Sequence, residues 1–423
     1  MKTHFFLFVL SLLLILCGCS RDNAGTAEIR EIYPESLSLV VGEVGGSDGS
    51  DDVIFLNIPD IKNGHPSFNA NAFVVFSKTN ELPCQSIDTN NDGSADRIAV
   101  LTDLSAGQQQ QLTLFYARTG IKKRDYPKRT QAEVSHKING HFEDRKYIGG
   151  EFHNVQVMNV PPEHTDHSYF IRYEGPGWES DKVGYRFYLD WRNATDIFGK
   201  KTPGMVLQNI GQDGFDSYHE MADWGMDILK VGESLGIGSI GMWYDGKAHR
   251  VAKTDSISCQ IVENGPLYSQ VSTTYWGWET AGKKHNLISD LSIIAGSRLT
   301  RHNLQVSGNP SNLCTGIVKH PGTTLVKKSG KPGGWGYLAT YGQQSLSGDK
   351  LGMAVFFKES ERISFENDQF NEVVVLKPTE GTLQYFFLGA WEQEPGGIQS
   401  ESEFMAYLET LAVKLDSPLT VKY

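Results

Sequence analysis

The chain has 423 residues, and its 39 lysine and arginine residues against 50 aspartate and glutamate residues give a formal net charge of −11. Charged residues make up 21% and aromatic residues 11% of the chain, which is typical of a folded rather than a disordered protein. The acidic balance argues against a nucleic-acid-binding protein, because such proteins usually present a basic face.

The N-terminus, MKTHFFLFVLSLLLILCGCS, has the pattern of an export signal, with Lys2 before an apolar run from Phe5 to Leu16. That run is too short to span a bilayer comfortably. It ends in LCGC, which resembles a bacterial lipobox. We therefore predict a lipoprotein signal peptide over residues 1–18 and lipidation of Cys19. The alternative is an ordinary secretory signal with incidental cysteines.

Both alternatives predict an exported protein. With the lipid, we expect it to be anchored to the outer membrane, on the periplasmic or the cell-surface face. The lipid would be its only contact with the membrane, since no later stretch is apolar enough to span one.

Residues 19–30 look like a flexible tether, and residues 31–120 read as short strands separated by turn residues. The strands are expected at 36–41, 52–58, 71–76, 97–104 and 110–117. A small β-sandwich is the natural interpretation. Residues 121–150 are basic and polar without clear periodicity, which indicates a linker or a long surface loop.

The N-terminal region contains DTNNDGSAD, residues 88–96, which matches the first nine positions of an EF-hand-type calcium loop. The candidate ligands are the side chains of Asp88, Asn90, Asp92 and Asp96. Position twelve is Ala99 rather than glutamate, so the usual bidentate ligand is missing. A structural calcium ion and a plain Asx-rich turn both remain open.

Residues 151–423 alternate or run apolar at strand length and predict a large β-sandwich of the galactose-mutarotase type. ETAGKK, residues 279–284, predicts a hairpin between two of its strands. Helical spacing appears only at the end, over residues 402–415, with Ser402 as a fair N-cap. The fold class is therefore all-β, two sandwiches followed by a short C-terminal helix.

The strand GYRFYLDWRN, residues 184–193, places Arg186, Tyr188, Asp190 and Arg192 on one face. This face is either a solvated surface with an ion pair or one wall of a cleft for an anionic sugar. Arginine suits a carboxylate or sulfate because its fork donates two parallel hydrogen bonds. The Gly/Pro-rich loop before this strand adds Arg172.

The stretch YHEMADWGMDILK, residues 218–230, combines His219, Asp223, Trp224 and Asp227 around a glycine. On a helix His219 and Asp223 would lie on one stripe, and they could pair as base and orienting group or bind a metal. A satisfied surface pair is the plain alternative. Trp224 fits both a sugar platform and core packing.

Two further candidates lie downstream. RLTRHNLQV places His302 on a strand face, and the loop GKPGGWGY could present Trp335 to a ligand. The sequence has no GxSxG, HExxH or Walker motif, and no GxGxxG after a strand, so we expect no organic cofactor. The three cysteines after the signal allow one disulfide, and no CxxC pair supports zinc.

Three blocks of the sequence together resemble a known family. They are DTNNDGSADRIAVLTDLSAG, YEGPGWESDKVGYRFYLDWRNATDIFGK and YHEMADWGMDILKVGESLG. The chain resembles a Bacteroidetes domain-of-unknown-function family of secreted proteins, encoded in polysaccharide-utilisation clusters near unsaturated-glucuronyl hydrolases and polysaccharide lyases. It is also similar to the oligosaccharide dehydratases of ulvan degradation.

The resemblance implies a carbon–oxygen lyase. Such an enzyme removes water from the non-reducing-end uronic acid of an anionic oligosaccharide and leaves a 4,5-unsaturated sugar. No catalytic set is carried over from the family. From residue types alone, His219, Tyr188 and His302 are the candidate catalytic residues. The candidate substrate-binding residues are Arg172, Arg186, Asp223, Trp224 and Trp335.

Two other functions stay open. A glycoside hydrolase acting on uronic-acid oligosaccharides would need two carboxylates at a defined separation. A non-catalytic surface glycan-binding lipoprotein would need only aromatic platforms and calcium. The partner expected in every case is an anionic oligosaccharide, not a nucleic acid.

Overall fold

The computed structural model describes residues 24–42, 49–104, 108–214, 217–417 and 419–423. The predicted signal peptide and the predicted lipidation of Cys19 lie outside these residues. Within them, no helix has both the length and the apolar character needed to cross a membrane.

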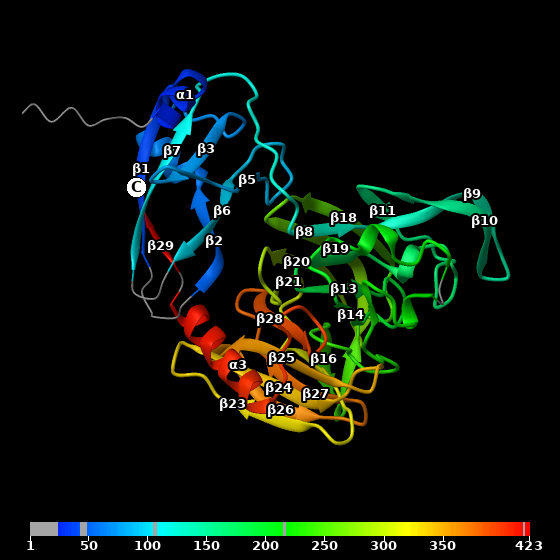
Figure 1. Ribbon diagram of the computed structural model, residues 1–423. Helices are drawn as coiled ribbons and strands as arrows, with labels where there is room; N and C mark the ends of the chain where they lie inside the picture. The colour runs from blue at the N-terminus through cyan, green and yellow to red at the C-terminus, as the bar shows by residue number, and fades with distance from the viewer. Residues whose placement is uncertain (1–23, 43–48, 105–107, 215–216, 418) are drawn as a thin grey trace, which may run out of the picture.

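The N-terminal domain is a small sandwich of two antiparallel sheets (Figure 1). One sheet has the order β29-β1-β7-β3-β4 and the other the order β2-β6-β5. The strands are β1 (Glu35–Gly42), β2 (Gly49–Asn57), β3 (Phe73–Ser77), β4 (Asn80–Leu82), β5 (Cys84–Ile87), β6 (Arg97–Leu104), β7 (Gln109–Tyr116) and β29 (Thr420–Lys422). Two short helices accompany them, α1 (Ala24–Ile32) and α2 (Ile58–Gly64).

Alternating apolar residues of the two sheets fill the space between them. Leu39, Leu56, Val75, Val100 and Leu114 are all completely buried in this core. Burying such side chains contributes roughly 1.5–3 kcal/mol each. The five strands expected here from the sequence are confirmed, each with its ends within three residues.

The large domain is built on a nine-stranded antiparallel sheet with the order β11-β18-β19-β20-β21-β28-β25-β24-β23. Its strands are β11 (Val157–Asn159), β18 (Ser256–Asn264), β19 (Tyr268–Thr280), β20 (Lys283–Ile294), β21 (Thr300–Val306), β23 (Thr324–Lys328), β24 (Trp335–Gln343), β25 (Lys350–Lys358) and β28 (Thr382–Trp391). The predicted hairpin is confirmed: Ala281 and Gly282 join β19 to β20, both with positive φ, as a type I′ turn requires.

Two five-stranded sheets accompany the nine-stranded sheet and share its core. The first contains β15-β14-β13-β12-β8 and the second β17-β16-β22-β27-β26. The first comprises β8 (Thr130–Glu133), β12 (Gly177–Ser180), β13 (Val183–Phe187), β14 (Thr195–Lys200) and β15 (Gly225–Asp227). The second comprises β16 (Gly241–Tyr244), β17 (Lys247–Arg250), β22 (Leu313–Val318), β26 (Arg362–Asn367) and β27 (Asn371–Leu376).

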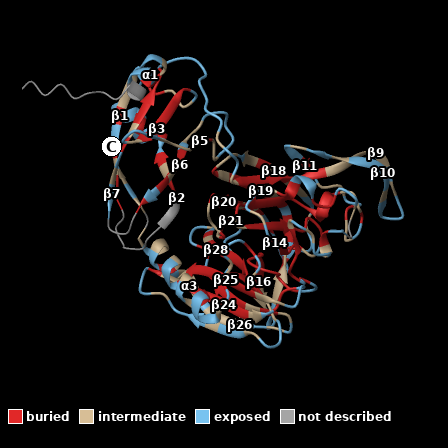
Figure 2. Ribbon diagram, in the orientation of Figure 1, coloured by how far each residue is buried: buried red, intermediate tan, exposed pale blue. Residues whose placement is uncertain are grey.

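One continuous core joins these sheets and includes the fully buried Tyr185, Trp278 and Phe387. Figure 2 shows the buried strands as the centre of the large domain. The prediction of a large β-sandwich is therefore confirmed.

The C-terminal helix α3 (Glu401–Asp416) packs against β24 and β25, where Phe404 and Leu408 are completely buried. Its opposite face is exposed (Figure 2). The N-cap lies two residues earlier than expected. Ser400, not Ser402, is the N-cap, and its hydroxyl accepts from the Glu403 amide at 3.2 Å.

Three predicted segment boundaries need correction. Residues 24–30 of the expected tether belong to α1, because Ile29 and the following Tyr33 bury their side chains against the N-terminal sheet. Residues 130–150 of the expected linker form β8, β9 (Ser135–Glu143) and most of β10 (Lys146–Asn154). Finally, β29 pairs with β1, so the chain end belongs to the N-terminal sheet.

The missed strands have a physical explanation. β9 and β10 form an isolated two-stranded hairpin with few buried residues, so they lack the apolar alternation that marks a strand. β8 is fully buried but only four residues long. Figure 1 shows the β9–β10 hairpin projecting from the large domain beside the segment that carries the candidate site.

Candidate functional site

The centre of the candidate site is Arg186, one residue before the end of β13 and 1% exposed. Asp196 lies directly opposite on β14, and Asp227 lies on the neighbouring strand β15. Nη2 of Arg186 donates to Asp196 at 2.9 Å and to Asp227 at 2.5 Å. Thus three strands of one sheet place a guanidinium group between two buried carboxyl groups.

Two tyrosines complete this cluster. The Tyr188 hydroxyl accepts from Arg186 at 2.9 Å and donates to Asp196 at 2.7 Å. The Tyr218 hydroxyl accepts from Nη1 of Arg186 at 2.9 Å. Tyr218 comes from the short 3₁₀ helix η3 (Ser217–His219), which covers this face of the sheet. The arginine face is therefore buried under a loop rather than open to solvent.

A second ion-pair group lies beside the first. Arg192 contacts Asp190, Glu174 and Asp166 at 2.5, 2.7 and 2.8 Å. Its guanidinium group stacks 3.9 Å above the Tyr188 ring, and its side chain is 12% exposed. Glu174 connects the two groups, since its other oxygen lies 3.8 Å from Arg186.

Each group carries one histidine at its more exposed side. Nδ1 of His167 lies 2.7 Å from Asp166, and Nε2 of His219 lies 3.5 Å from Asp227. The imidazoles are 46% and 33% exposed, whereas Asp227 is 1% exposed. A histidine oriented by a carboxyl group is the arrangement that general acid–base catalysis uses.

The loop that carries this site has an unusual backbone. Positive φ angles occur there at His167, Tyr169, Tyr173 and Glu174, and also at Asn193 in the loop between β13 and β14. Each such non-glycine residue costs of order 1–3 kcal/mol, and such residues cluster at functional sites. Hydrogen bonds hold the loop: the His167 amide donates to Glu174 at 3.1 Å, and the Tyr173 hydroxyl donates to Glu133 at 2.8 Å.

A pocket of about 10 Å³, room for a single water molecule, lies between this loop, β10 and η3. Its walls include His167, Tyr169, Tyr173, Glu174 and Tyr218. His219 lies next to it, with its ring centre 4.4 Å from that of Tyr218. The pocket thus combines aromatic walls with histidine and carboxylate groups, and Oε2 of Glu174 is buried there without a hydrogen-bond partner.

The carboxyl groups differ in how they hold protons. Burial and the neighbouring Asp196 keep the pKa of Asp227 well above its ordinary value, in spite of Arg186. Burial also raises the pKa of Glu174, but Arg192 and Arg186 outweigh it, so the pKa of Glu174 is below its usual range. Glu174 is therefore a carboxylate, and Asp227 resists losing its proton.

The structure brings three of the predicted site residues together: Arg186, Tyr188 and His219. Tyr188 is 5% exposed and burial raises its pKa. Because its hydroxyl is held by Asp196 and Arg186, it fits positioning better than contact with substrate. Arg172 lies nearby but is fully buried in an ion pair with Glu133.

The prediction for the stretch 218–230 needs correction. It forms neither a helix nor one long strand but η3, a turn and β15. His219 therefore pairs with Asp227 and not with Asp223, which is exposed. Trp224 packs edge-on against Phe198 at 5.9 Å, as a partly buried member of an apolar cluster.

Two predicted residues lie away from the site. His302 is completely buried in the core, where it bonds to Ser289 at 2.7 Å, and burial lowers its pKa to about 3. It faces inward because residues alternate along β21, so the prediction that it is catalytic is corrected. Trp335 packs against Phe386 and its amide donates to Asp416 of α3.

The predicted calcium loop is held by its own backbone. Asp88 accepts from the amides of Asp92 and Gly93, and Asp92 accepts from that of Ser94. Thr89 donates to Asp96 at 2.5 Å from its hydroxyl and at 3.1 Å from its amide. These contacts suit an Asx-rich turn, and they also orient the loop oxygens, so calcium binding stays a prediction.

Within the described ranges, one group of three His, Cys, Asp or Glu residues has ligand atoms within 4.8 Å of one another: Asp166, His167 and Glu174. Arg192 already contacts both of these carboxylates. The cation that this group holds is therefore the guanidinium group. Cys84, Cys259 and Cys314 are buried and free, so the disulfide considered from the sequence is not formed.

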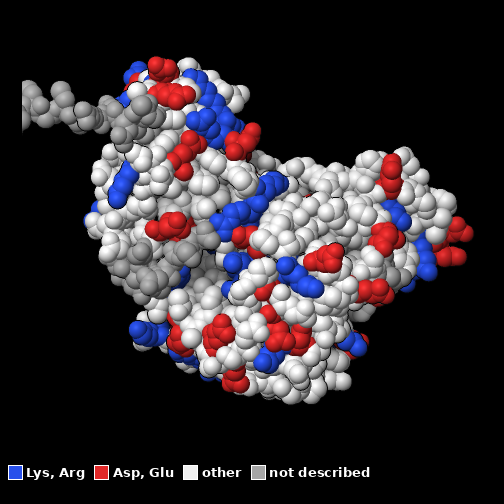
Figure 3. All heavy atoms as spheres, in the orientation of Figure 1, with Lys and Arg blue, Asp and Glu red and all other residues white. Residues whose placement is uncertain are grey.

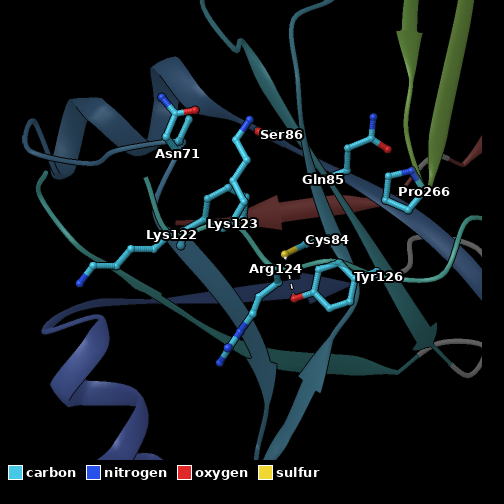
Figure 4. A pocket seen from close by; sticks show the side chains of 11 residues that line it. Asn71, Cys84, Gln85, Ser86, Lys122, Lys123, Arg124, Tyr126 and Pro266 are labelled. Atoms are coloured by element: carbon cyan, nitrogen blue, oxygen red, sulfur yellow. Dashed lines mark hydrogen bonds between the residues drawn. The ribbon is translucent and has the colours of Figure 1, made fainter. Parts of the chain in front are cut away.

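Another pocket lies in the N-terminal domain, around Cys84, Tyr126 and residues 122–124 (Figure 4). Figure 4 shows the Tyr126 hydroxyl pointing to the Cys84 sulfur, 3.7 Å away. Burial raises the pKa of Cys84 to about 12, which keeps the thiol protonated and unreactive. Arg124 lies 3.2 Å from Glu81. This pocket therefore offers little chemistry.

Several residues of the site were not among the catalytic or binding candidates chosen from the sequence, namely Asp166, His167, Glu174, Asp196, Tyr218 and Asp227, although Tyr218 and Asp227 lie in the stretch 218–230 that the sequence singled out. Their partners come from strands and loops far apart in the chain, so no local spacing reveals them. The usable signals were weak: the consecutive Asp166–His167 pair and the abundance of ionisable residues within 164–196.

Comparison with known proteins gives distant structural matches. An alpha-mannosidase from Enterococcus faecalis V583 matches with a TM-score of 0.47 at 9% identity, over 94% of this chain and 48% of that one. A protein in the glycosyl hydrolase family 38 from Enterococcus faecalis matches with a TM-score of 0.47 at 8% identity, over 93% and 48%. The chain thus spans about half the length of these proteins.

No curated protein matches the sequence. A family profile does, over residues 47–421, which covers both domains and every residue of the candidate site. The chain therefore belongs to the family described as domain of unknown function DUF4861.

Proposed function

We propose that the protein is a carbohydrate-active enzyme that removes water from a terminal uronic acid of an anionic oligosaccharide such as those of ulvan. The product is a 4,5-unsaturated uronate. The observation that carries the proposal is the pair of partly exposed histidines, His167 and His219, each beside a carboxyl group at a tyrosine-lined pocket. The resemblance of the central sequence blocks to oligosaccharide dehydratases supports the same reaction.

The elimination needs two proton transfers. A base removes the weakly acidic proton from C5, and an acid protonates the C4 hydroxyl as it leaves as water. The C5–H electron pair forms the new double bond as the C4–O bond breaks. His167 and His219 supply one group for each step, with Asp166 and Asp227 orienting them.

The substrate carboxylate must be neutralised while enolate-like charge develops at C5. Arg192 is the more exposed guanidinium group of the site, and Arg186 lies behind it. Asp166, which is 35% exposed, contacts Arg192 at the more open side of this group, so a substrate carboxylate can approach Arg192 there while Asp166 stays beside His167. The overall acidity of the protein is no obstacle, because charges are screened over about 10 Å at 0.1 M salt.

A hydrolase with paired carboxylates fits this site less well. It needs a protonated carboxylic acid at the glycosidic oxygen. Glu174, which lines the pocket, has a lowered pKa, and Asp227, whose pKa is raised, is buried against Arg186. The described pocket therefore favours proton transfer by histidine.

The test is incubation of the purified protein with saturated glucuronyl–rhamnose-3-sulfate oligosaccharides, followed by mass spectrometry and ultraviolet absorbance. Loss of one water with a new conjugated double bond is the expected result. Gain of water with chain cleavage would identify a hydrolase. Unchanged oligosaccharides that nevertheless bind would identify a glycan-binding lipoprotein.

Export and lipid anchoring through Cys19 are part of the same proposal. Replacement Cys19→Ser should abolish lipidation and release the protein from the membrane fraction. Cells are grown with a labelled fatty acid and then fractionated. The label on the protein measures lipidation, and the amount of protein in the membrane fraction measures anchoring.

A further inference from the structure

A large cavity lies where the N-terminal domain, the nine-stranded sheet and α3 meet. Its volume is about 530 Å³. Phe55 and Arg97 line it from the N-terminal domain, Tyr268, Arg301 and Phe386 from the sheet, and Tyr407 from α3. Figure 3 shows Lys and Arg atoms gathered along the junction between the two domains.

This cavity is separate from the candidate active site. The two share no lining residue. Arg301 and His302 are neighbours on β21, so their side chains point to opposite faces of the nine-stranded sheet. His302 faces the sandwich core, and Arg301 faces the cavity. The chemistry of this cavity is therefore independent of the proposed function.

The cavity contains positive charge that no carboxylate offsets. Arg298 pairs with Glu394, and Lys414 pairs with Asp52 at 2.9 Å. In contrast, neither Arg97 nor Arg301 forms an ion pair with any residue that the structure describes. Both are thus available to an anion, in a protein whose net charge is −11.

Arg301 is held in place by neutral groups. Its Nε donates to the side-chain oxygen of Asn303 at 3.2 Å. Its Nη2 donates to the side-chain oxygen of Gln384 at 2.6 Å. Burial and the nearby positive charge of Arg97 lower the pKa of Arg301. Asp290, which lies opposite Asn303 on the neighbouring strand β20, accepts a hydrogen bond from Ser272. A fixed, uncompensated guanidinium group is prepared for an oxyanion.

The rest of the wall is aromatic. The Tyr268 ring meets Phe55 edge-on at 5.8 Å, and Phe386 and Tyr407 are only partly buried. Such rings offer apolar faces to the C–H groups of a flat ligand. The cavity is also large enough for a sugar-sized molecule.

We propose that this interdomain cavity is a second binding site, for a ring-shaped organic anion. A carboxylate or sulfate of the ligand binds Arg97 and Arg301, and its ring lies against Tyr268 and Phe386. Carboxylate and sulfate share the chemistry that these arginines recognise, and binding experiments distinguish them.

Isothermal titration calorimetry tests the proposal with three probes: methyl glucuronoside, glucose 6-sulfate and neutral methyl glucoside. At least one charged probe should bind in the cavity, more weakly as sodium chloride is added, and a second binding event of methyl glucuronoside, which is a uronic acid, belongs to the candidate active site. Methyl glucoside should bind at least ten times more weakly. The charged probe that binds more tightly identifies the preferred oxyanion.

Arg301→Gln and Arg97→Gln should each weaken binding about tenfold or more. Arg97 is exposed, so its replacement leaves folding intact even if Arg301→Gln destabilises the protein. Arg118→Gln is the matched control, since it removes the same charge from an exposed ion pair with Glu35. His219→Ala should leave this binding unchanged.

Three results would overturn the proposal. They are equal binding of methyl glucoside, binding that survives both arginine replacements, and binding that only His219→Ala removes. The last result would place the ligand in the candidate active site instead. Absence of binding by both charged probes would overturn it as well.

Discussion

Nε2 of His219 lies 3.5 Å from Oδ2 of Asp227, so a partly exposed imidazole contacts a fully buried carboxyl group. The same oxygen accepts a hydrogen bond from Arg186. This contact links the pocket to the buried charge network, and it couples the proton held by Asp227 to the stability of the site.

The pKa of Asp227 is raised in the folded protein, so its proton stabilises the fold at low pH. This contribution is complete below the unfolded pKa of about 4 and is lost as the pH rises through the folded pKa. Asp227→Asn removes the titration but keeps the shape. The stability advantage of the wild type over this variant should therefore shrink as the pH rises, measured by urea unfolding between pH 4 and 8. A constant difference would contradict the assignment.

His167→Asn and His219→Asn should each lower kcat for the elimination about 10²–10⁴-fold, the usual contribution of a general acid or base. The KM should change much less, because neither imidazole is the main anion contact. The conversion is followed by ultraviolet absorbance. His320→Asn, at an exposed position remote in sequence, is the control and should retain full activity. Full activity in both site variants would exclude this pair.

The buried His302 should make the stability of the protein depend on pH in the opposite direction. Burial lowers its pKa to about 3, so the folded protein resists protonation that the unfolded chain accepts at about pH 6.5. Stability should therefore fall as the pH drops from 6.5 toward 3, by up to about 1.4 kcal/mol per pH unit. His302→Gln should flatten this part of the curve. Its activity at pH 7 should stay within about twofold of the wild type, whereas a catalytic His302 would cost far more.

Gly175 holds the loop of the candidate site against β13. A Cβ atom added there would meet the Phe187 carbonyl oxygen at 1.6 Å, and backbone cannot move aside. Gly175→Ala should therefore destabilise the protein by about 3 kcal/mol or more and abolish activity. Gly204→Ala is the matched control, because its new Cβ would lie 3.5 Å from the nearest atom. Its thermal midpoint should be nearly unchanged. Equal midpoints for both variants would contradict the packing of this loop.

Calcium should stabilise the N-terminal domain through the loop of residues 88–96. Removal of calcium with a chelator should lower the thermal midpoint by several degrees, and added calcium should restore it. Asp92→Ala should abolish this response. A midpoint that is indifferent to calcium would assign the loop as an Asx-rich turn, consistent with its internal hydrogen bonds.

Much of the fold follows from local patterns. β6 and β7 are runs of β-branched and apolar residues between turns, and their spacing alone predicts them. The β19–β20 hairpin and α3 are equally local. By contrast, β8 is too short to show a period, and β13 ends at Phe187 although the alternation continues to Arg192. Tertiary contacts of the following loop, not the alternation, end that strand.

The site was only partly predictable, because its chemistry depends on contacts between distant segments. Arg186 and Tyr188 could be identified as an unusual polar strand face. That Asp227 rather than Asp223 meets His219 depends on where β15 pairs with β14, which the sequence does not reveal. His302 has the residue type of a catalyst, and only its burial excludes it.

The pairing of β29 with β1 has a consequence for how the protein is made. β1 emerges from the ribosome early, whereas the strand that completes its sheet follows the whole large sandwich. The first sheet of the N-terminal domain therefore gains its last edge strand only after the rest of the chain has been synthesised. Until then, the β1 edge of this sheet has no partner strand. Loss of the final residues would leave the β1 edge exposed to pairing with other chains.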